Sequence, residues 1–562
     1  MKKIHLYIAI FIAISSFWAC EIERKPFQDL EDEQVFSDEL GIEAAALGTY
    51  ALLKENSFMR PYHFHGEYGG DNIALSGSTT DALYYMYNFQ HTVNNGHLNS
   101  LWVTSYKGII NSNKVIENAA RGTSDKMDHI IGEMYYLRGF FYFTMVNIWG
   151  RPYTQAPTSN LGVPLILDAE PDENNLPPRA TVAEVYAQIE ADLKMAAELM
   201  GNYDRPAEEL RIFASIESAW ALLSRVYLYM ENDTEAAAYA TDVIESGKFG
   251  LLQGDAFTKY PTYVPEENSE TIFACRSLED EDNYGWMAIG GMYANIDGVG
   301  WGEMYASQPY RDLVGQYPED LRNSFIEPQY VEHGDADAFG NPYNFITYVT
   351  DKDEPAGSKM FTTAYAWYEE GIWYYYDGAS WPTVETEAGV DGKATKYFIY
   401  IDGVKTYVEP GAEMEVRNGY PKYYVTKCSN QGGQPQLWSP VISRLAEMYL
   451  NRAEANAKTG NESAALEDIN VIRQRAGIPT YDAVPAGRTA LELVLEERQL
   501  ELAFESHRRY DIFRNGLTLD RTYPGTHDRG NAILTIPANH NRVIDFIPET
   551  QILAQPNLVQ NP

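Results

Sequence analysis

Hydrophobic residues between positions 40 and 250 recur at helical spacing, and one stretch has the pattern of two antiparallel helices. One stripe, at i, i+3, i+4, i+7 and i+11, consists of Ile216, Ala219, Trp220, Leu223 and Tyr227. After a turn at residues 231–233, a second stripe carries Ala236, Ala237, Ala240, Val243 and Ile244. Its small alanines allow the two helices to approach closely. The pattern therefore predicts a helix–turn–helix pair.

The same arrangement returns near the C-terminus, within residues 441–476. One predicted helix is lined by Leu445, Met448, Tyr449 and Ala453, and the return helix by Ala465, Leu466, Ile469 and Ile472. Each pair resembles a tetratricopeptide (TPR) unit, but two units about 220 residues apart do not make a tandem repeat. We expect a helical scaffold that is interrupted by a long insertion.

The predicted insertion, residues 251–440, differs from the rest of the chain in composition. It is about a third of the chain, yet it holds six of the ten Trp and 21 of the 42 Tyr, punctuated by Gly and Pro. Alternating runs at Tyr397–Ile401 and Lys405–Val408, joined by Asp402-Gly403, predict a β-hairpin. Loops with aromatic residues on a rigid frame often bind ligands, so we expect the ligand face here, with most of the rings filling the core.

The first twenty residues have the pattern of an export signal. Lys2 and Lys3 precede an apolar run, Ile8 to Ile14, that is too short to span a bilayer. Ala19-Cys20 resembles a lipoprotein processing site, and the alternative is a plain signal peptide with an incidental Cys. Acylation of Cys20 would anchor the chain without a transmembrane helix.

These patterns divide the chain into five parts. They are a signal peptide (1–19), a lipidated Cys with an acidic tether (20–40), an N-terminal TPR-like helical part (41–250), the aromatic-rich loop region (251–440), and a C-terminal part with a TPR-like pair, a long helix and a tail (441–562).

Charge and motifs exclude several classes of function. The formal charge of −37 disfavours binding to nucleic acid or to an anionic lipid surface. The sequence contains no HExxH, GxSxG or Walker-type motif and no Cys/His spacing typical of zinc. We therefore predict a non-catalytic protein without a metal or cofactor. Cys275 and Cys428 are compatible with one disulfide or with two buried thiols.

Five ordered segments together resemble the SusD/RagB family of outer-membrane nutrient-binding lipoproteins. They are residues 35–53 after the lipoprotein signal, Glu133–Gly150 with Gly162-Val-Pro164, Arg444–Ala455 with Asp468 and Arg473, Glu497–Gly516, and Ile547-Pro548 with the tail 557–562. The match spans essentially the whole chain. The departures are Phe546, Ala554-Gln555 and an end at Pro562 without the usual Gly-Tyr.

The residues of these motifs point to fold maintenance rather than to chemistry. We expect Arg138, which lies among aromatic residues, to be buried against a carboxylate. Glu497, Glu501 and Glu505 are spaced i, i+4 and i+8, which predicts one salt-bridged helix face with Arg498 and Arg508 nearby, continued by Asp511 and Arg514.

The resemblance implies a mainly α, SusD-like fold and a surface-exposed lipoprotein of the outer membrane. It also implies that the protein captures oligosaccharide or polysaccharide and delivers it to a TonB-dependent SusC-type transporter. A sugar ring stacks its C–H face on Trp or Tyr while neighbouring polar groups bind its hydroxyls. The candidate ligand-binding residues are Asp71, Tyr84, Trp286, Tyr293, Trp301 and Trp373.

Three alternatives stay open at this point. In the first, the uptake system is the same but its cargo is a peptide or another nutrient. In the second, the chain is a lipid-anchored glycoside hydrolase on an α-toroid. In the third, it is a TPR adaptor with no ligand of its own. A hydrolase releases reducing ends from its substrate, whereas a binding protein loses affinity when a loop Trp is replaced and releases no product.

Overall fold

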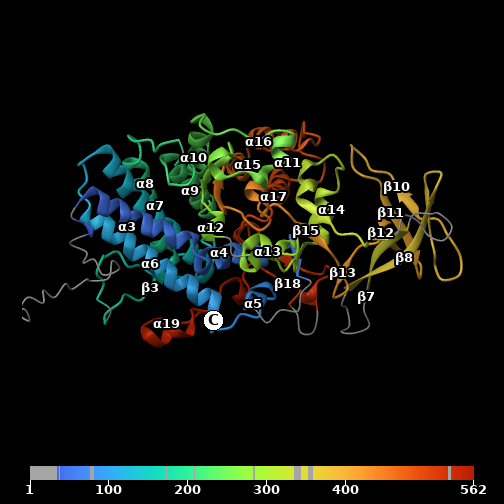
Figure 1. Ribbon diagram of the computed structural model, residues 1–562, viewed down its shortest axis with the longest axis horizontal. Coiled ribbons are helices and arrows are strands. Elements are labelled where there is room, and N and C mark those ends of the chain that lie inside the picture. Colours follow the sequence, from blue (N-terminus) through green and yellow to red (C-terminus); the bar gives the residue numbers. More distant parts are fainter. Residues whose placement is uncertain are drawn as a thin grey trace, which may run out of the picture.

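Two groups of helices form a broad body, and a β-sheet projects from one end of it (Figure 1). The computed structural model describes residues 35–36, 38–75, 82–172, 174–207, 209–282, 285–333, 343–351, 359–528 and 533–562. The expected signal peptide, Cys20 and most of the tether lie outside the described residues. Within the described ranges, none of the helices combines the length and the apolar character needed to cross a bilayer.

Helices dominate the body, as the hydrophobic periodicity predicts. The longer ones are α3 (Glu39–Lys54), α4 (Asn56–Tyr68), α6 (Gly96–Asn118), α7 (Asp125–Trp149), α8 (Val182–Leu199), α9 (Ile216–Tyr229), α10 (Asp233–Glu245), α15 (Leu445–Lys458), α16 (Glu462–Ala476) and α17 (Ala490–Glu501). The shorter ones are α5 (Leu83–Tyr87), α11 (Asp255–Thr258), α12 (Glu279–Asp282), α13 (Ile289–Tyr293), α14 (Gln308–Val314), α18 (Arg508–Arg514) and α19 (Glu549–Ala554).

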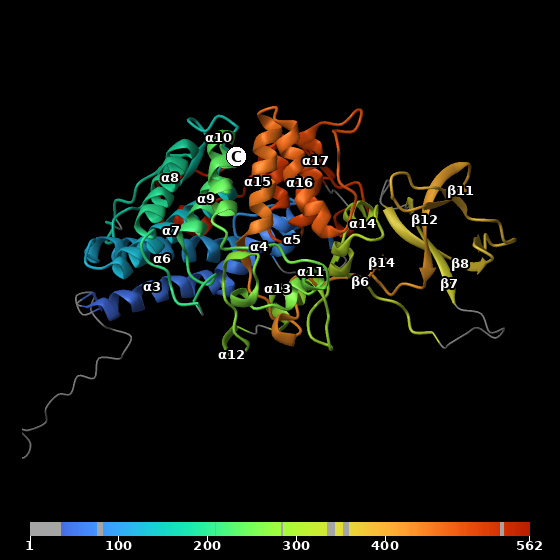
Figure 2. The same cartoon turned by 90° about the horizontal axis from the view of Figure 1, so that it is seen from above.

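The two predicted TPR-like pairs, α9–α10 and α15–α16, are confirmed and lie against each other. Ser215 caps α9 by accepting a hydrogen bond from the Ser218 amide, and Gly477 ends α16 at φ 80°. Helix α10 packs on α15, so the two pairs are neighbours in space although the loop region separates them in sequence (Figure 2). The helical scaffold is therefore continuous across the insertion.

Paired strands hold the two ends of the insertion together. Strand β4 (Thr271–Ala274) pairs antiparallel with β16 (Val441–Arg444), which leads directly into α15. Four further two-stranded ladders are β2 (Leu161–Pro164) with β3 (Arg179–Thr181), β6 (Ile326–Pro328) with β15 (Tyr423–Val425), β13 (Val416–Arg417) with β14 (Tyr420–Pro421), and β17 (Leu519–Asp520) with β18 (Thr535–Ile536).

The insertion also contains an antiparallel sheet of six strands, at the right of Figure 1. Its spatial order is β10 (Glu385–Glu387), β11 (Lys396–Ile401), β12 (Val404–Ala412), β7 (Asn344–Asp351), β8 (Lys359–Glu369) and β9 (Ile372–Tyr375). The predicted hairpin is confirmed as β11–β12, and Asp402 and Gly403 turn the chain with positive φ. The local pattern of the sequence predicts this hairpin but not the larger sheet around it.

Arg138 on α7 is buried against a carboxylate, as expected. Its guanidinium binds both carboxylate oxygens of Asp192 on α8, at 2.9 and 2.6 Å, and also donates to the side-chain oxygen of Asn113 on α6. Three helices are thus joined by one fully paired cation, which is the arrangement that makes a buried charge tolerable.

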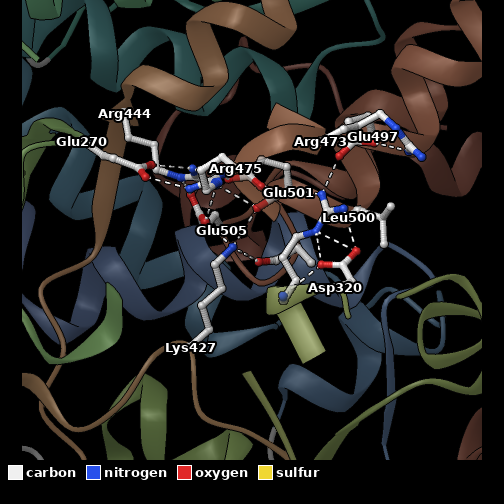
Figure 3. A network of polar contacts seen from close by, with 12 residues as sticks. Glu270, Asp320, Lys427, Arg444, Arg473, Arg475, Glu497, Leu500, Glu501 and Glu505 are labelled. Atoms are coloured by element: carbon white, nitrogen blue, oxygen red, sulfur yellow. Dashed lines mark hydrogen bonds and ion pairs between the residues drawn. The ribbon is translucent and has the colours of Figure 1, made fainter. Parts of the chain in front are cut away.

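A buried network of five cations and five carboxylates joins the loop region to the C-terminal helices (Figure 3). The cations are Arg322, Lys427, Arg444, Arg473 and Arg475, and the carboxylates are Glu270, Asp320, Glu497, Glu501 and Glu505. Arg444 lies 2.6 Å from Glu501 and 2.7 Å from Glu505, and Arg475 contacts both Glu501 and Glu270. Each of these buried ions has at least one partner of opposite charge, and the positive and negative charges are equal in number.

The single salt-bridged helix predicted over 497–516 is wrong in two respects. Helix α17 ends at Glu501 and α18 begins at Arg508, because Phe504 and Ser506 both adopt positive φ in the link between them. Glu505 is therefore not on the face of Glu497 and Glu501, and the partners of these carboxylates come from distant segments. The predicted pair of Asp511 and Arg514 is confirmed at 2.6 Å.

The two cysteines in the body do not pair. Cys275 and Cys428 are both free and buried, and burial raises the pKa of the Cys275 thiol to about 12. Of the two arrangements left open by the sequence, the structure has the buried thiols.

Candidate functional site

Two loops that were expected to form the ligand face are joined by a short β-ladder. Strand β1 (Ile73–Leu75) follows Asp71 and pairs with β5 (Met304–Ala306), which follows Trp301. The Ser307 side chain also donates a hydrogen bond to the Asp71 carbonyl, at 2.5 Å. Segments more than 200 residues apart in the chain thus form one local unit.

Trp286 and Trp301 form an exposed aromatic pair. Their ring centroids lie 5.2 Å apart with an interplanar angle of 72°, and the two side chains are 46% and 48% exposed. Large aromatic residues normally contribute their apolar area to a core. These two rings instead meet edge to face at the surface and form a corner that is open to solvent.

Hydrogen bonds and glycine conformations fix the backbone around this aromatic corner. The amides of Trp301 and Gly302 both donate to the Gly291 carbonyl on α13. Gly300 and Gly302 have φ of 107° and 51°, and a Cβ atom on Gly300 would lie 2.3 Å from the Ala294 carbonyl oxygen. The glycines that mark this segment in the sequence therefore serve a tight loop that presents Trp301.

An ion pair borders the corner. Arg417 donates to the Trp301 carbonyl at 2.7 Å and to the Glu303 carboxylate at 2.8 Å, and the Arg417 side chain is one-third exposed. Arg417 reaches this place from the β13–β14 hairpin, which turns at Asn418-Gly419 with both φ positive. Neither Arg417 nor Glu303 is among the residues predicted from the sequence. The Asn-Gly signal could have located the hairpin, but nothing local pairs it with Trp301.

Asp71 and Tyr84 lie outside the aromatic corner. The Asp71 carboxylate is held by Arg508 at 2.6 and 2.9 Å and by Gln499 at 3.3 Å, so its oxygens already have protein partners. Tyr84 is half-buried, and its ring meets the more exposed Tyr85 at 6.2 Å on α5. Asp71 thus supports the loop through an ion pair, while Tyr84 and Tyr85 form a separate aromatic patch.

Tyr293 does not lie on the surface, contrary to expectation. Its ring is fully buried, its hydroxyl is 2.9 Å from Nε2 of His63, and it packs against Phe504. The reason is its position in α13, whose five residues are all buried, whereas Trp286 precedes that helix. Trp373 is half-buried on strand β9 and contacts Tyr368 at 4.8 Å, so it belongs to the six-stranded sheet.

The aromatic corner combines apolar and polar surface. The two rings offer apolar faces, and beside them the guanidinium of Arg417, which is one-third exposed and paired with the buried Glu303, offers a donor group. Such a combination suits a ligand with both C–H faces and hydroxyl groups. Within the part of the chain that the structure describes, no group of three or more His, Cys, Asp or Glu is placed to hold a metal ion.

Comparison of the sequence with known families agrees with this architecture. Residues 269–562, just over half of the chain, match the sequence model described as "SusD family", and residues 23–228 match one described as "Starch-binding associating with outer membrane". The chain is 24% identical over 555 residues to the SusD-like protein P38 of Formosa agariphila, covering 92% of this chain and 95% of that protein.

Solved structures share the fold along the whole length of the body. A SusD superfamily protein from Bacteroides thetaiotaomicron is 23% identical with a TM-score of 0.70, covering 93% of this chain and 99% of that one. A structure described as a putative sugar binding protein from Bacteroides vulgatus is 24% identical with a TM-score of 0.67, covering 93% and 98%. The fold is mainly α and SusD-like, and the chain belongs to the SusD family.

Proposed function

We propose that the protein binds a glycan non-catalytically, with the Trp286–Trp301 corner as the centre of the site. The observation that carries this proposal is the exposure of two tryptophan rings on a closely held loop beside the Arg417–Glu303 pair. Stacking on a sugar ring requires flat, exposed aromatic faces, and the partly exposed Arg417 can donate to the hydroxyls at the edge of the sugar. A matching family description names starch binding, and one structural neighbour is described as a putative sugar binding protein.

We also propose a cellular location and a partner for the protein. We propose that Cys20 carries the lipid, that the protein is anchored to the outer membrane facing outwards, and that it passes the glycan to a TonB-dependent SusC-type transporter. The family description that mentions association with the outer membrane supports the location. Two acyl chains on one Cys suffice for stable anchoring.

Replacing Trp286 or Trp301 by alanine should lower, at least tenfold, the affinity for the glycan that the unaltered protein binds. Truncating a central aromatic anchor costs about 2 kcal/mol or more, which corresponds to more than tenfold in affinity. Isothermal titration of Trp286→Ala, Trp301→Ala and the double variant against the glycan measures this loss.

The matched control is Trp367→Ala, because Trp367 is also an exposed tryptophan but lies on strand β8 of the sheet. It should keep the affinity of the unaltered protein. Equal affinity of the Trp286→Ala/Trp301→Ala protein and the unaltered protein would contradict the placement of the site.

A further inference from the structure

The six-stranded sheet carries a hollow of its own, far from the tryptophan corner. The hollow has a volume of about 610 Å³ and is lined by residues of β7, β8, β9 and β11, with the loop after β9 and Glu413 at its edge. Helix α13, which holds the corner, lies in the middle of the molecule in both views, whereas the sheet lies at one end (Figures 1 and 2).

Strand register places the side chains of Tyr348, Ala364, Tyr375, Ile399 and Ile401 on one face of the sheet, which is the face of the hollow, whereas Phe345, Thr363, Tyr365 and Tyr400 belong to the opposite face and border the hollow with their backbone. Tyr348 pairs with Thr362 and with Val408, and Tyr375 pairs with Ala366, so both tyrosines point to the same side as Ile399. This face buries its own small apolar cluster around Ile346, while Tyr348 and Tyr375 stay half-buried at the edge of that cluster. Trp373, two residues before Tyr375, shares this face.

The lining is aromatic and acidic. Tyr348 and Tyr375 present their rings on the face of the hollow, the carboxylates Asp377 and Glu413 lie at its rim, and no Lys or Arg is among the described residues that line it. Asp377 is preorganised by hydrogen bonds from the amides of Ala379 and Ser380, at 2.8 and 2.7 Å. An anionic ligand is disfavoured by this charge. The carboxylates of Asp377 and Glu413 already have protein partners, and each can accept further hydrogen bonds from ligand hydroxyls.

The ligand that fits both features is a neutral carbohydrate. Its C–H faces match the tyrosine rings, its hydroxyls match the carboxylates and phenol groups, and the volume is in the range of about 300–1,000 Å³ typical of small-molecule sites. We propose that the hollow on the six-stranded sheet is a second carbohydrate-binding site, which takes a short neutral stretch of glycan. This inference rests on the proposed glycan-binding function.

The presence of two sites on one chain leads to a further expectation. A polysaccharide long enough to reach both sites should bind more tightly than a short oligosaccharide of the same sugar, because the second contact is intramolecular. The short oligosaccharide should bind with a stoichiometry of two.

The test uses the full chain with amylopectin, xylan, mannan, laminarin and dextran and with short oligosaccharides prepared from each. Titration calorimetry compares the unaltered protein, Trp286→Ala/Trp301→Ala, Tyr348→Ala/Tyr375→Ala and the combination of all four changes. Tyr407→Ala is the matched control, because Tyr407 is exposed on the opposite face of the same sheet. Tyr348→Phe/Tyr375→Phe keeps the rings and removes only the hydroxyls, and far-UV circular dichroism checks the fold of each variant.

We expect the Trp286→Ala/Trp301→Ala protein to keep residual glycan binding. Adding Tyr348→Ala/Tyr375→Ala to it should reduce this residual binding at least tenfold, whereas Tyr407→Ala should have no effect. If the tryptophan variant loses all binding and the tyrosine variant binds like the unaltered protein, the second site is overturned and the proposed function stands. If the unaltered protein binds none of the glycans, or if oligolysine binds the hollow instead, the second site is overturned, and the former result removes the proposed function as well.

Discussion

Glu501→Gln should destabilise the folded protein by about 3–5 kcal/mol, the range measured when one partner of a buried ion pair is removed. The Glu501 carboxylate contacts Arg444 and Arg475 and lies 3.7 Å from Arg322. These cations hold the pKa of Glu501 far below its usual range even though burial alone would raise it. Glutamine has nearly the same shape but no charge, so it would leave an excess positive charge in the interior.

Glu496→Gln is the matched control on the same helix. Glu496 is partly exposed and pairs with the half-exposed Arg488 at 2.7 Å, and such surface pairs contribute only about 0–1 kcal/mol. Urea denaturation followed by circular dichroism measures both variants. If Glu501→Gln unfolds at the same urea concentration as Glu496→Gln, the network does not stabilise the fold in the way described.

Acidification should unfold the protein well before its carboxylates are protonated, because burial keeps five histidines neutral. The pKa is lowered to about 3 in His63 and His527, to about 4 in His65 and His91, and well below the ordinary value in His507, and burial is the largest cause each time. An unfolded chain protonates these groups near pH 6.5.

The sign of the effect follows from the direction of these shifts. A lowered pKa in the folded state means that unfolding takes up protons, so stability is present above about pH 6.5 and falls towards pH 4. Glu67 acts in the opposite direction, because burial raises its pKa to about 7 and its contribution is lost as the pH rises. On unfolding, the five histidines take up about five protons and Glu67 releases one, so the net uptake is about four protons. Each of these protons changes the free energy of unfolding by about 1.4 kcal/mol per pH unit.

Denaturation midpoints between pH 7.5 and 4.5 measure this slope. His63→Gln should reduce the slope by one proton even if it also lowers the stability, because the slope reports proton uptake and not absolute stability. A protein that is equally stable at pH 7 and pH 5 would contradict the prediction.

The helices could be predicted from the sequence because their signals are local. The stripes in α9 and α15 and the turns after them depend on residues only a few positions apart, and the buried role of Arg138 follows from its aromatic neighbours. The partners of Glu501 could not be predicted in this way, since they come from residues 322, 444 and 475 and meet only in the folded chain.

The candidate site was predictable as a region but not residue by residue. Trp286 and Tyr293 stand seven positions apart in one glycine-rich segment, yet one is exposed and the other is buried against His63. Composition indicates that such a segment carries aromatic residues, but which ring reaches solvent depends on how α13 packs. The pairing of Arg417 with Glu303 and the assembly of six strands into one sheet likewise depend on contacts between distant residues.

The central claim is that the protein binds a glycan and does not cleave it. The most direct measurement is calorimetric titration of residues 21–562, without the lipid, against the panel of polysaccharides and oligosaccharides, with an assay of each mixture for new reducing ends. We expect saturable binding to one class of glycan and no release of reducing ends. New reducing ends in the mixture, or no binding to any glycan of the panel, would contradict it.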